Sequence, residues 1–295
     1  MPKRIIEISK DGCYLRLKHQ QLIIEQNKET LGSIPIEDMS ALIIDNPQTI
    51  ISQSVLSKLV SNNVMVVSTD ENHLPIGLFL PLSSHTTQTE RFAEQINLSK
   101  PIKKNLWKQI IRSKVLLQAK VLNDLTDNDG GIRLLAKKIR SGDPDNIEAQ
   151  AARRYWNRLF EDKTFRRDRT AEDQNRFLNY GYAILRALFA RSLVACGLHP
   201  SLGLHHHNRY NAYCLADDMM EPYRPLVDLH VWSITQELAV DSEMDRELKS
   251  RLLEIVKTQV QLENETYTFQ GAIQKSSQSL ARVILDEGKT LILPS

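Results

Sequence analysis

Residues 101–126 read PIKKNLWKQIIRSKVLLQAKVLNDLT, and their apolar side chains recur at helical spacing. Apolar residues three or four positions apart lie on one face of a helix. The stretch therefore predicts a long helix, which opens a helical region that continues towards the end of the chain. The apolar stripe consists of Trp107, Ile110, Ile111, Leu117, Val121 and Leu125.

The first 80 residues carry the shorter patterns of β-strands instead. Residues 41–45 and 64–68 are continuous apolar runs, which are typical of strands buried on both faces. Residues 13–18 alternate apolar and polar side chains, as a half-buried strand does. Further strands are expected at 5–8 and 21–25, and one short helix is expected between the two apolar runs.

These patterns predict an α+β fold with two domains. Residues 1–82 form a small β-rich N-terminal lobe, residues 83–100 a polar linker, and residues 101–295 a larger all-helical C-terminal lobe. Within the helical lobe, further helices are expected to begin at the Asp143–Pro144 pair and near Asp173, Asp241 and Gly271.

The composition is that of a folded, soluble protein. Of 295 residues, 41% are hydrophobic and 25% are charged, which excludes an intrinsically disordered chain. The 38 Lys and Arg against 36 Asp and Glu leave a net charge of +2, so the total charge does not indicate a nucleic-acid partner. Three widely spaced cysteines, and the lack of any apolar stretch of about 20 residues, lead us to expect a cytoplasmic protein that does not enter membranes.

Glu148 stands on the apolar side of its predicted helix. Steps of three, four, seven and eight residues lead from it to Ala151, Ala152, Tyr155 and Trp156, so the carboxylate continues an apolar stripe. A carboxylate directed at a core is costly unless it is paired or binds a metal. The alternative is an acid that the helix dipole favours near the N-terminus, and the spacing leaves both interpretations open.

Two further stretches carry side chains that can bind metals. His205, His206 and His207 follow turn residues, so at least one imidazole is placed on a loop, as a ligand, a proton carrier or a plain polar residue. Asp218 and Glu221 are three residues apart, so a helical turn puts both on one side, with an acidic helix start as the alternative. Carboxylates combined with an imidazole favour Mg²⁺ or Mn²⁺.

Basic residues gather in the helical lobe ahead of the histidines. Among them, Arg166, Arg167 and Arg169 are speculative contacts for DNA phosphates, although solvated helix faces are the commoner outcome. Beside a divalent-metal site, basic residues are better candidates for phosphate contacts, because phosphodiester chemistry needs both a metal and groups that hold the phosphates. The clusters lie at residues 103–104, 137–140, 153–158 and 165–169.

Three motifs in this order resemble those of the CRISPR-associated adaptation integrases, and most closely the type II branch of that family. They are IEAQAARRYW at residues 147–156, GLHH at 203–206 and DMMEPYRPLVD at 218–228. Each motif is loose, but the ordered set is specific, and the resemblance covers nearly the whole chain. It implies a β-rich N-terminal lobe and a helical C-terminal lobe.

The resemblance also implies the site residues. Glu148, His206 and Glu221 match the family's metal-binding catalytic triad, and Asp218 is a nearby acidic contributor to the metal site. His206 is chosen over His205 and His207 because it lies three residues after Gly203, as in the family's Gly-x-x-His motif. Glu221 stands where many relatives carry Asp, which keeps the charge and lengthens the side chain.

By the same resemblance, the reaction is spacer acquisition in antiviral defence. The chain is expected to form a homodimer through its N-terminal lobes and a heterohexamer with a smaller CRISPR adaptation subunit. This assembly holds short foreign double-stranded DNA, whose 3′-hydroxyl attacks a phosphodiester at the edge of a CRISPR repeat, with Mg²⁺ or Mn²⁺ at the site. Whether the RNA-guided effector nuclease also joins is left open.

Two other functions use the same residues. A plain metal-dependent nuclease acting on branched or damaged DNA would use water in place of the 3′-hydroxyl as the nucleophile. A non-catalytic DNA-binding scaffold would keep the acidic and histidine residues for structural reasons. The chain contains no HExxH, P-loop or GxSxG motif, which disfavours a zinc protease, an NTPase and a hydrolase of the nucleophile-elbow type.

Overall fold

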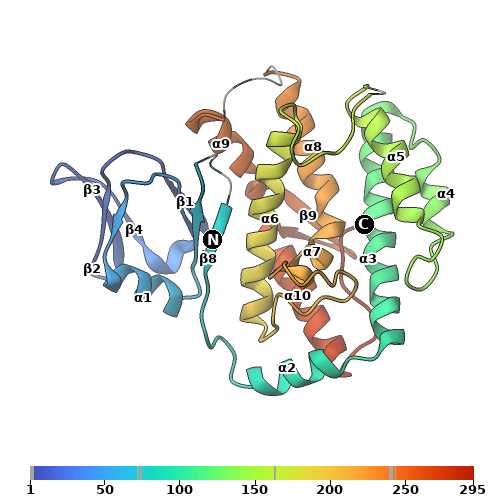
Figure 1. Cartoon of the computed structure of the whole chain (residues 1–295), viewed down its shortest axis with the longest axis horizontal. Helices are drawn as coiled ribbons and strands as arrows, with labels where there is room; N and C mark the ends of the chain where they lie inside the picture. Colours follow the sequence, from blue (N-terminus) through green and yellow to red (C-terminus); the bar gives the residue numbers. More distant parts are fainter. Residues whose placement is uncertain (1–2, 72, 74, 163, 239–241, 243) are drawn as a thin grey trace. The chain divides into compact units, whose positions relative to one another are not determined.

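The computed structural model describes residues 3–71, 73, 75–162, 164–238, 242 and 244–295. The chain divides into two compact units, Met1–Ser84 and His85–Ser295. The first is rich in strands and the second is mainly helical, which confirms the predicted α+β fold class (Figure 1).

One sheet of the N-terminal unit has the strand order β1-β5-β7-β8. Its first three strands, β1 (Arg4–Ile8), β5 (Met39–Ile44) and β7 (Met65–Thr69), are parallel, and β8 (Pro75–Phe79) runs antiparallel at the edge. The inner strands β5 and β7 are largely buried, and this explains why their sequences are continuous apolar runs and do not alternate.

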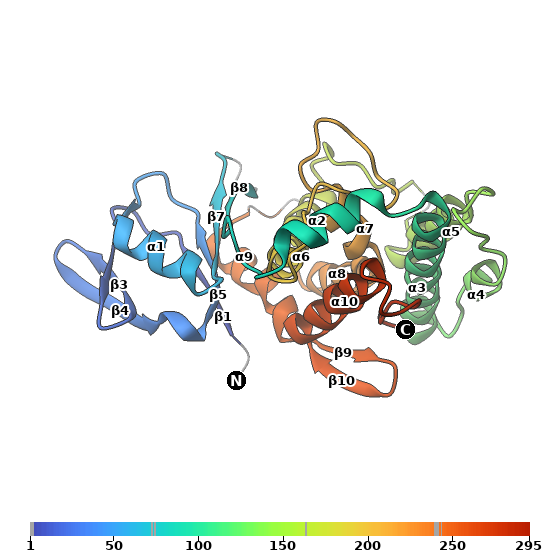
Figure 2. The same ribbon diagram turned by 90° about the horizontal axis from the view of Figure 1, so that it is seen from below.

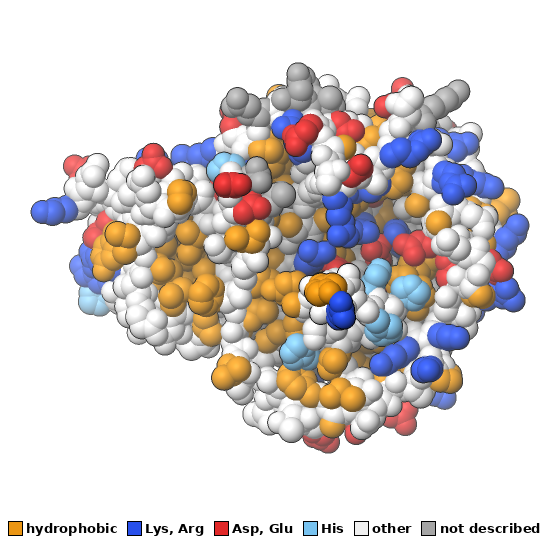
Figure 3. Space-filling model, in the orientation of Figure 1, with side chains coloured by type: hydrophobic (Ala, Val, Ile, Leu, Met, Phe, Trp, Pro, Cys, Tyr) orange, Lys and Arg blue, Asp and Glu red, His pale blue; other side chains and the backbone are white. Residues whose placement is uncertain are grey.

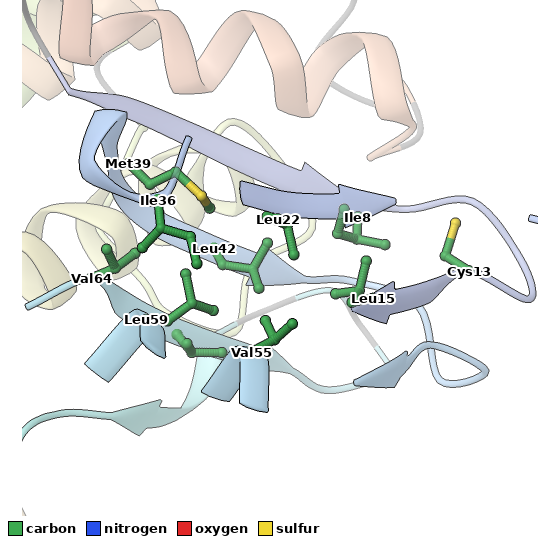
Figure 4. Close-up of a cluster of buried hydrophobic side chains, with 11 residues drawn as sticks. Ile8, Cys13, Leu15, Leu22, Ile36, Met39, Leu42, Val55, Leu59 and Val64 are labelled. Atoms are coloured by element: carbon green, nitrogen blue, oxygen red, sulfur yellow. The ribbon is translucent and has the colours of Figure 1, made fainter. Parts of the chain in front are cut away.

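The second sheet of this unit has the strand order β4-β3-β2-β6. The helix α1 (Gln53–Ser61) contributes Val55 and Leu59 to the core, where they meet Leu15, Leu22 and Leu42 from the strands (Figure 4). The expected strands are all present, and β4, β6 and β8 are additional. The strands are β2 (Tyr14–Lys18), β3 (Gln21–Gln26), β4 (Glu29–Pro35) and β6 (Ile50–Ile51), with the 3₁₀ turn η1 (Ile36–Asp38) before β5.

The C-terminal unit is built around the long helix α3 (Lys100–Thr126). Figures 1 and 2 show α4 (Ile132–Ala136) and α5 (Ile147–Leu159) beside α3, while α6 (Asn175–Ala195) packs against the remaining helices. Those are α7 (Cys214–Met220), α8 (Arg224–Thr235), α9 (Arg246–Leu253) and α10 (Phe269–Ile284), with the 3₁₀ turns η2 (Glu221–Tyr223) and η3 (Glu254–Lys257).

The expected linker at residues 83–100 contains a helix, α2 (Gln88–Asn97), and the two units meet in sequence between Ser84 and His85. Gln95 is the buried residue of α2. Its amide donates to the carbonyls of His199 at 2.9 Å and Leu202 at 3.1 Å, so a polar side chain anchors the helix. The large apolar residues of α2 are Phe92 and Ile96, and Ile96 is exposed, so this helix carries too short an apolar stripe to stand out in the sequence.

Two other expectations in the helical lobe need correction. The lobe is not all-helical, because β9 (Gln259–Leu262) and β10 (Glu265–Thr268) form an antiparallel hairpin before α10. Helix α5 begins at Ile147 and not at the Asp143–Pro144 pair; the Asp143 carboxylate instead accepts hydrogen bonds from the first amides of α5. The expected helix start at Asp241 lies outside the described residues, and α9 begins at Arg246.

Within the described part of the chain, no helix has both the length and the apolar character that a membrane span requires.

Candidate metal centre

Glu148 and Glu221 come from different helical segments and meet at one cation, Lys114. The Lys114 ammonium lies 2.6 Å from Glu148 Oε1 and 2.6 Å from Glu221 Oε2. Lys114 stands in the middle of α3, Glu148 in the first turn of α5, and Glu221 at the start of η2. The packing of α5 and η2 on α3 therefore brings together two carboxylates that are 73 residues apart in the sequence (221 − 148).

The two carboxylates differ in their surroundings. The Glu221 side chain is 5% exposed, and its second oxygen accepts a hydrogen bond from the Arg224 guanidinium at 2.7 Å. Burial alone raises the pKa of Glu221, but the adjacent Arg224 and Lys114 outweigh burial and lower this pKa to about 2. Glu148 is 28% exposed, so one carboxylate is enclosed while the other is partly accessible to solvent.

Lys114 is itself almost fully buried. Burial lowers the pKa of an ammonium, yet Glu221 and Glu148 reverse this effect and raise the pKa of Lys114 above its ordinary value. The ammonium is therefore charged at neutral pH, and it balances part of the negative charge of the two glutamates.

The histidine loop is held by Asp218, which is fully buried on α7. Its carboxylate accepts hydrogen bonds from the backbone amides of Leu204 (2.6 Å), His205 (2.9 Å) and His206 (3.2 Å). It also contacts His206 Nδ1 at 2.6 Å. This last hydrogen bond, against the opposing effect of burial, raises the pKa of His206 and fixes the orientation of its ring.

Gly203 explains the spacing of the Gly-x-x-His motif. A Cβ atom at Gly203 would collide with the carbonyl oxygen of His206 and lie 3.0 Å from Cys214 Cβ and 3.1 Å from Asp218 Oδ2. The loop thus folds back so closely that only a residue without a side chain fits where it begins. This close approach is what allows one carboxylate to hold three consecutive amides and a ring.

The three neighbouring histidines have different surroundings. The His205 ring stacks in parallel on Trp107, with ring centroids 4.1 Å apart and planes 2° apart. The His206 ring is held at Nδ1 by Asp218, which leaves Nε2 as the nitrogen available to a ligand. His207 is exposed. His206 therefore has the one support that is typical of metal-binding histidines, a hydrogen bond from its other nitrogen to a carboxylate.

A second buried layer lies behind Glu221. The Tyr182 hydroxyl donates to the carboxylate of Asp228, which is 1% exposed, and the Arg224 guanidinium lies 4.4 Å from the centre of the Tyr182 ring. Burial raises the pKa of Asp228 to about 7, against the lowering effects of the Tyr182 hydrogen bond and Arg224. Arg224 thus connects the two layers, because it contacts both Glu221 and the Tyr182 ring.

The three arginines proposed as DNA contacts lie between α5 and α6 and differ in exposure. Arg166 and Arg169 are exposed. Arg167 is half-buried and donates to the side chains of Asn175 at 2.8 Å and Asn179 at 2.6 Å, which gives it a structural role in this loop. Arg166 and Arg167 line a cavity of about 340 Å³ together with Arg153, Trp156, Asn157 and Phe165.

Two site residues were missed at the sequence level, Lys114 and Arg224. Lys114 lies four residues after Ile110 and three before Leu117. It is therefore a charged residue on the apolar stripe of α3, just as Glu148 is a charged residue on the apolar stripe of α5. Opposite charges at two such positions indicate a buried pair, which was the available signal. Arg224 lies three residues after Glu221, at the spacing of a helical ion pair.

The donor groups fit a divalent metal in their chemistry. Two carboxylates already converge on one cation, and the His206 ring presents Nε2 from a loop fixed by a buried carboxylate. Among the described residues, however, no three His, Cys, Asp or Glu side chains form a ready metal-binding group. The Lys114 ammonium lies between the two glutamates in this arrangement. Figure 3 shows His, acidic and basic side chains gathered on this face of the C-terminal unit.

A family model described as "CRISPR associated protein Cas1" matches residues 6–260. The chain belongs to the Cas1 family. It is 38% identical over 288 residues to the CRISPR-associated endonuclease Cas1 of Neisseria meningitidis serogroup C, across 96% of this chain and 93% of that protein. The resemblance of the three sequence motifs to this family is therefore confirmed.

Solved structures show the same fold at low sequence identity. A casposase bound to its integration product is similar with a TM-score of 0.80 and 19% identity, over 99% of this chain and 93% of the casposase chain. A Cas6-RT-Cas1–Cas2 complex contains a chain that is similar with a TM-score of 0.74 and 16% identity, over 99% of this chain and 36% of the longer one. At these identities the similarity establishes the fold.

Proposed function

We propose that the chain is a metal-dependent DNA integrase of CRISPR adaptation, which inserts short foreign DNA into a repeat array. The observation that carries the proposal is the convergence of Glu148 and Glu221 on one cation, in the unit that also holds His206 on its Asp218-bound loop. Membership of the Cas1 family supports it. So does the fold that the chain shares with a casposase solved with its integration product.

In this proposal Glu148, Glu221 and His206 hold Mg²⁺ or Mn²⁺. A divalent cation bound there would supply Lewis-acid stabilisation of the charge that develops on the phosphoryl oxygens. Asp218 does not need to be a ligand: both of its oxygens are used by the loop, so we assign it the role of positioning His206. Arg224 keeps Glu221 ionised and oriented.

The proposed reaction is a transesterification. The 3′-oxygen of the incoming DNA forms a bond to phosphorus, the bond from phosphorus to the 3′-oxygen of the repeat strand breaks, and the proton of the attacking hydroxyl ends on the leaving oxygen. No covalent link to the protein forms, so the site needs no Ser, Cys or Tyr nucleophile. Arg166 and Arg169 are exposed and suited to hold backbone phosphates next to the reacting strand.

We also propose the partners. They are double-stranded DNA as spacer precursor and as repeat, a second copy of this chain bound through the N-terminal unit, and a small adaptation subunit in a heterohexamer. The similarity to a chain of a Cas1–Cas2 complex supports the adaptation subunit as a partner. The effector nuclease would be an additional partner, and the cytoplasm is the compartment where such an assembly meets the repeat array.

A strand-transfer assay separates integration from plain nuclease activity. The assay contains the chain, the small adaptation subunit, Mn²⁺, a plasmid with a repeat array, and a labelled duplex with free 3′-hydroxyls. A duplex with 3′-dideoxy ends is the control. We expect joined products from the first duplex only. Nicked or shortened DNA with both duplexes, and no joined product, would establish a hydrolytic nuclease that uses water.

The same assay tests the scaffold alternative through Glu148→Ala. Loss of one ligand is expected to lower strand transfer by about 1,000-fold or more, while DNA binding and the fold persist. Glu90→Ala is the matched control, because Glu90 is also an acid in the first turn of a helix, α2. If Glu148→Ala processed DNA as fast as Glu90→Ala, the residues would be structural.

A further inference from the structure

Lys114 is placed where a divalent cation would be expected. It is a buried lysine in the middle of a 27-residue helix, with its ammonium at 2.6 Å from both proposed carboxylate ligands. A buried lysine without compensation is rare, and this one is compensated by the two groups that the reaction needs. The ammonium therefore competes for the same oxygens that would hold a metal.

The charges of this cluster already cancel. Lys114 and Arg224 carry two positive charges, and Glu148 and Glu221 carry two negative charges. A divalent cation added between the glutamates would face the Lys114 ammonium at close range in a partly buried site, where repulsion between like charges is strong. Metal binding is therefore favourable only if Lys114 leaves at least one carboxylate and finds another anion.

A DNA phosphate is the anion that the substrate brings. The lysine side chain has a flexible four-carbon stem and a compact charge, so it can exchange partners without movement of the helix. Glu221 would stay in place during the exchange, because Arg224 independently holds its other oxygen at 2.7 Å. Lys114 can therefore leave the cluster while Arg224 remains bound to Glu221.

We propose that Lys114 couples metal binding to DNA binding: without DNA its ammonium holds Glu148 and Glu221 and opposes the metal, and with DNA it shifts to a phosphate and releases them. This inference rests on the proposed metal site. Coupling of this kind is reciprocal, so DNA must tighten metal binding by the same factor by which metal tightens DNA binding. The arrangement would keep an unliganded chain from holding an active metal.

The test measures the affinity of Mn²⁺ alone, by titration calorimetry, with and without a duplex that has unreactive 3′-dideoxy ends. For the unmodified chain, we expect the duplex to tighten Mn²⁺ binding by about tenfold, within the usual range of allosteric coupling. Lys114→Met is expected to bind Mn²⁺ about tenfold more tightly without DNA and to lose most of the effect of the duplex. Lys114→Arg keeps the cation, so without DNA it should bind Mn²⁺ no more tightly than the unmodified chain does.

Matched variants keep the result interpretable. Lys120→Met removes an exposed lysine from the same helix, and we expect it to leave both affinities unchanged. Lys114→Gln is the second neutral variant if Lys114→Met fails to fold, since an amide can still donate hydrogen bonds to both carboxylates. Thermal unfolding without metal gives an independent readout, because neutral variants should unfold at lower temperature and regain stability when Mn²⁺ is added.

Three outcomes would overturn the inference. The first is a duplex that leaves Mn²⁺ affinity unchanged in the unmodified chain, which can be observed without any variant. The second is weaker Mn²⁺ binding in the neutral Lys114 variants, which would mean that Lys114 assembles the ligands. The third is coupling that survives in those variants.

Failure of the metal site itself has a different signature. In that case Glu148→Gln would bind Mn²⁺ as tightly as the unmodified chain does.

Discussion

Asp218 and Glu221 are both buried carboxylates, three residues apart, yet they hold different parts of the site. Asp218 accepts hydrogen bonds from three backbone amides and contacts the Nδ1 of His206, all in one loop. Glu221 contacts two side-chain cations, Lys114 and Arg224. Asp218 therefore holds the backbone of a loop in place, whereas Glu221 forms ion pairs with side chains of two other helices.

The difference shows which carboxylate can change partners. Backbone amides cannot move away from Asp218 unless the loop unfolds, so its hydrogen bonds are permanent in the folded chain. An ammonium on a flexible stem can leave Glu221, so that oxygen is available to a metal. Both carboxylates are buried, so burial does not tell a positioning residue from a metal ligand. The kind of partner that each carboxylate contacts does.

The largest effect is expected from Glu221→Gln. It removes a proposed ligand, so strand transfer should fall by about 1,000-fold or more. It also leaves Lys114 and Arg224 without their shared carboxylate, and removing one partner of a buried charge pair costs about 3 kcal/mol of unfolding free energy. Strand transfer and urea unfolding measure the two losses separately.

The double variant Lys114→Met, Glu221→Gln separates charge balance from ligand loss. It removes one charge of each sign, so most of the lost stability should return while strand transfer stays absent. A double variant as unstable as Glu221→Gln would contradict the view that the ion pair, and not the packing of Glu221, stabilises this layer.

Part of this site was predictable from sequence because periodicity reports which face of a helix a residue occupies. Glu148 was placed on the stripe that includes Ala151 and Tyr155, and both of these neighbours are buried. The N-terminal strands β5 and β7 were recognised for a similar reason, since inner parallel strands are apolar throughout. Local patterns of this kind need no knowledge of the tertiary fold.

The remaining features depend on contacts between distant segments. The apolar stripes direct Lys114 and Glu148 at a core, but they do not show that these two residues and Glu221 meet one another, because α3, α5 and η2 come together only in the folded unit. Asp218 and Glu221 were expected on one side of a turn, but their different partners come from a loop and from α3. Helix α2 was read as a linker because the buried contacts of Gln95 are with His199 and Leu202, more than 100 residues away in the sequence.

Substitutions of Asp218 and of the three histidines test whether Asp218 acts by orienting His206. His206→Ala should lower strand transfer by about 100-fold, and Asp218→Asn by a similar factor, because both remove the oriented Nε2. His205→Ala removes a ring stacked on Trp107 and His207→Ala removes an exposed ring, but neither removes the oriented Nε2 of His206, so strand transfer should stay within about threefold of the unmodified chain. Equal losses at all three histidines would show that the loop, and not His206, is what matters.

The smallest effect concerns a third buried carboxylate, Asp228, whose pKa burial raises to about 7. Because its pKa in the folded chain lies above the unfolded value of 3.8, the folded state binds a proton more tightly than the unfolded state does. The resulting stability is present at low pH and is lost as the pH rises through the folded-state pKa. Asp228→Asn removes this dependence.

The measurement is the unfolding free energy of the unmodified chain minus that of Asp228→Asn, so that other titrating groups cancel. This difference should fall by about 2 kcal/mol between about pH 5 and about pH 7 and then level off. Asp124→Asn, an exposed aspartate on α3, should show no such slope. A difference that rises with pH would mean that the Tyr182 hydrogen bond and Arg224 stabilise the Asp228 carboxylate more than burial destabilises it, which would make Asp228 a third ion-paired residue like Glu221.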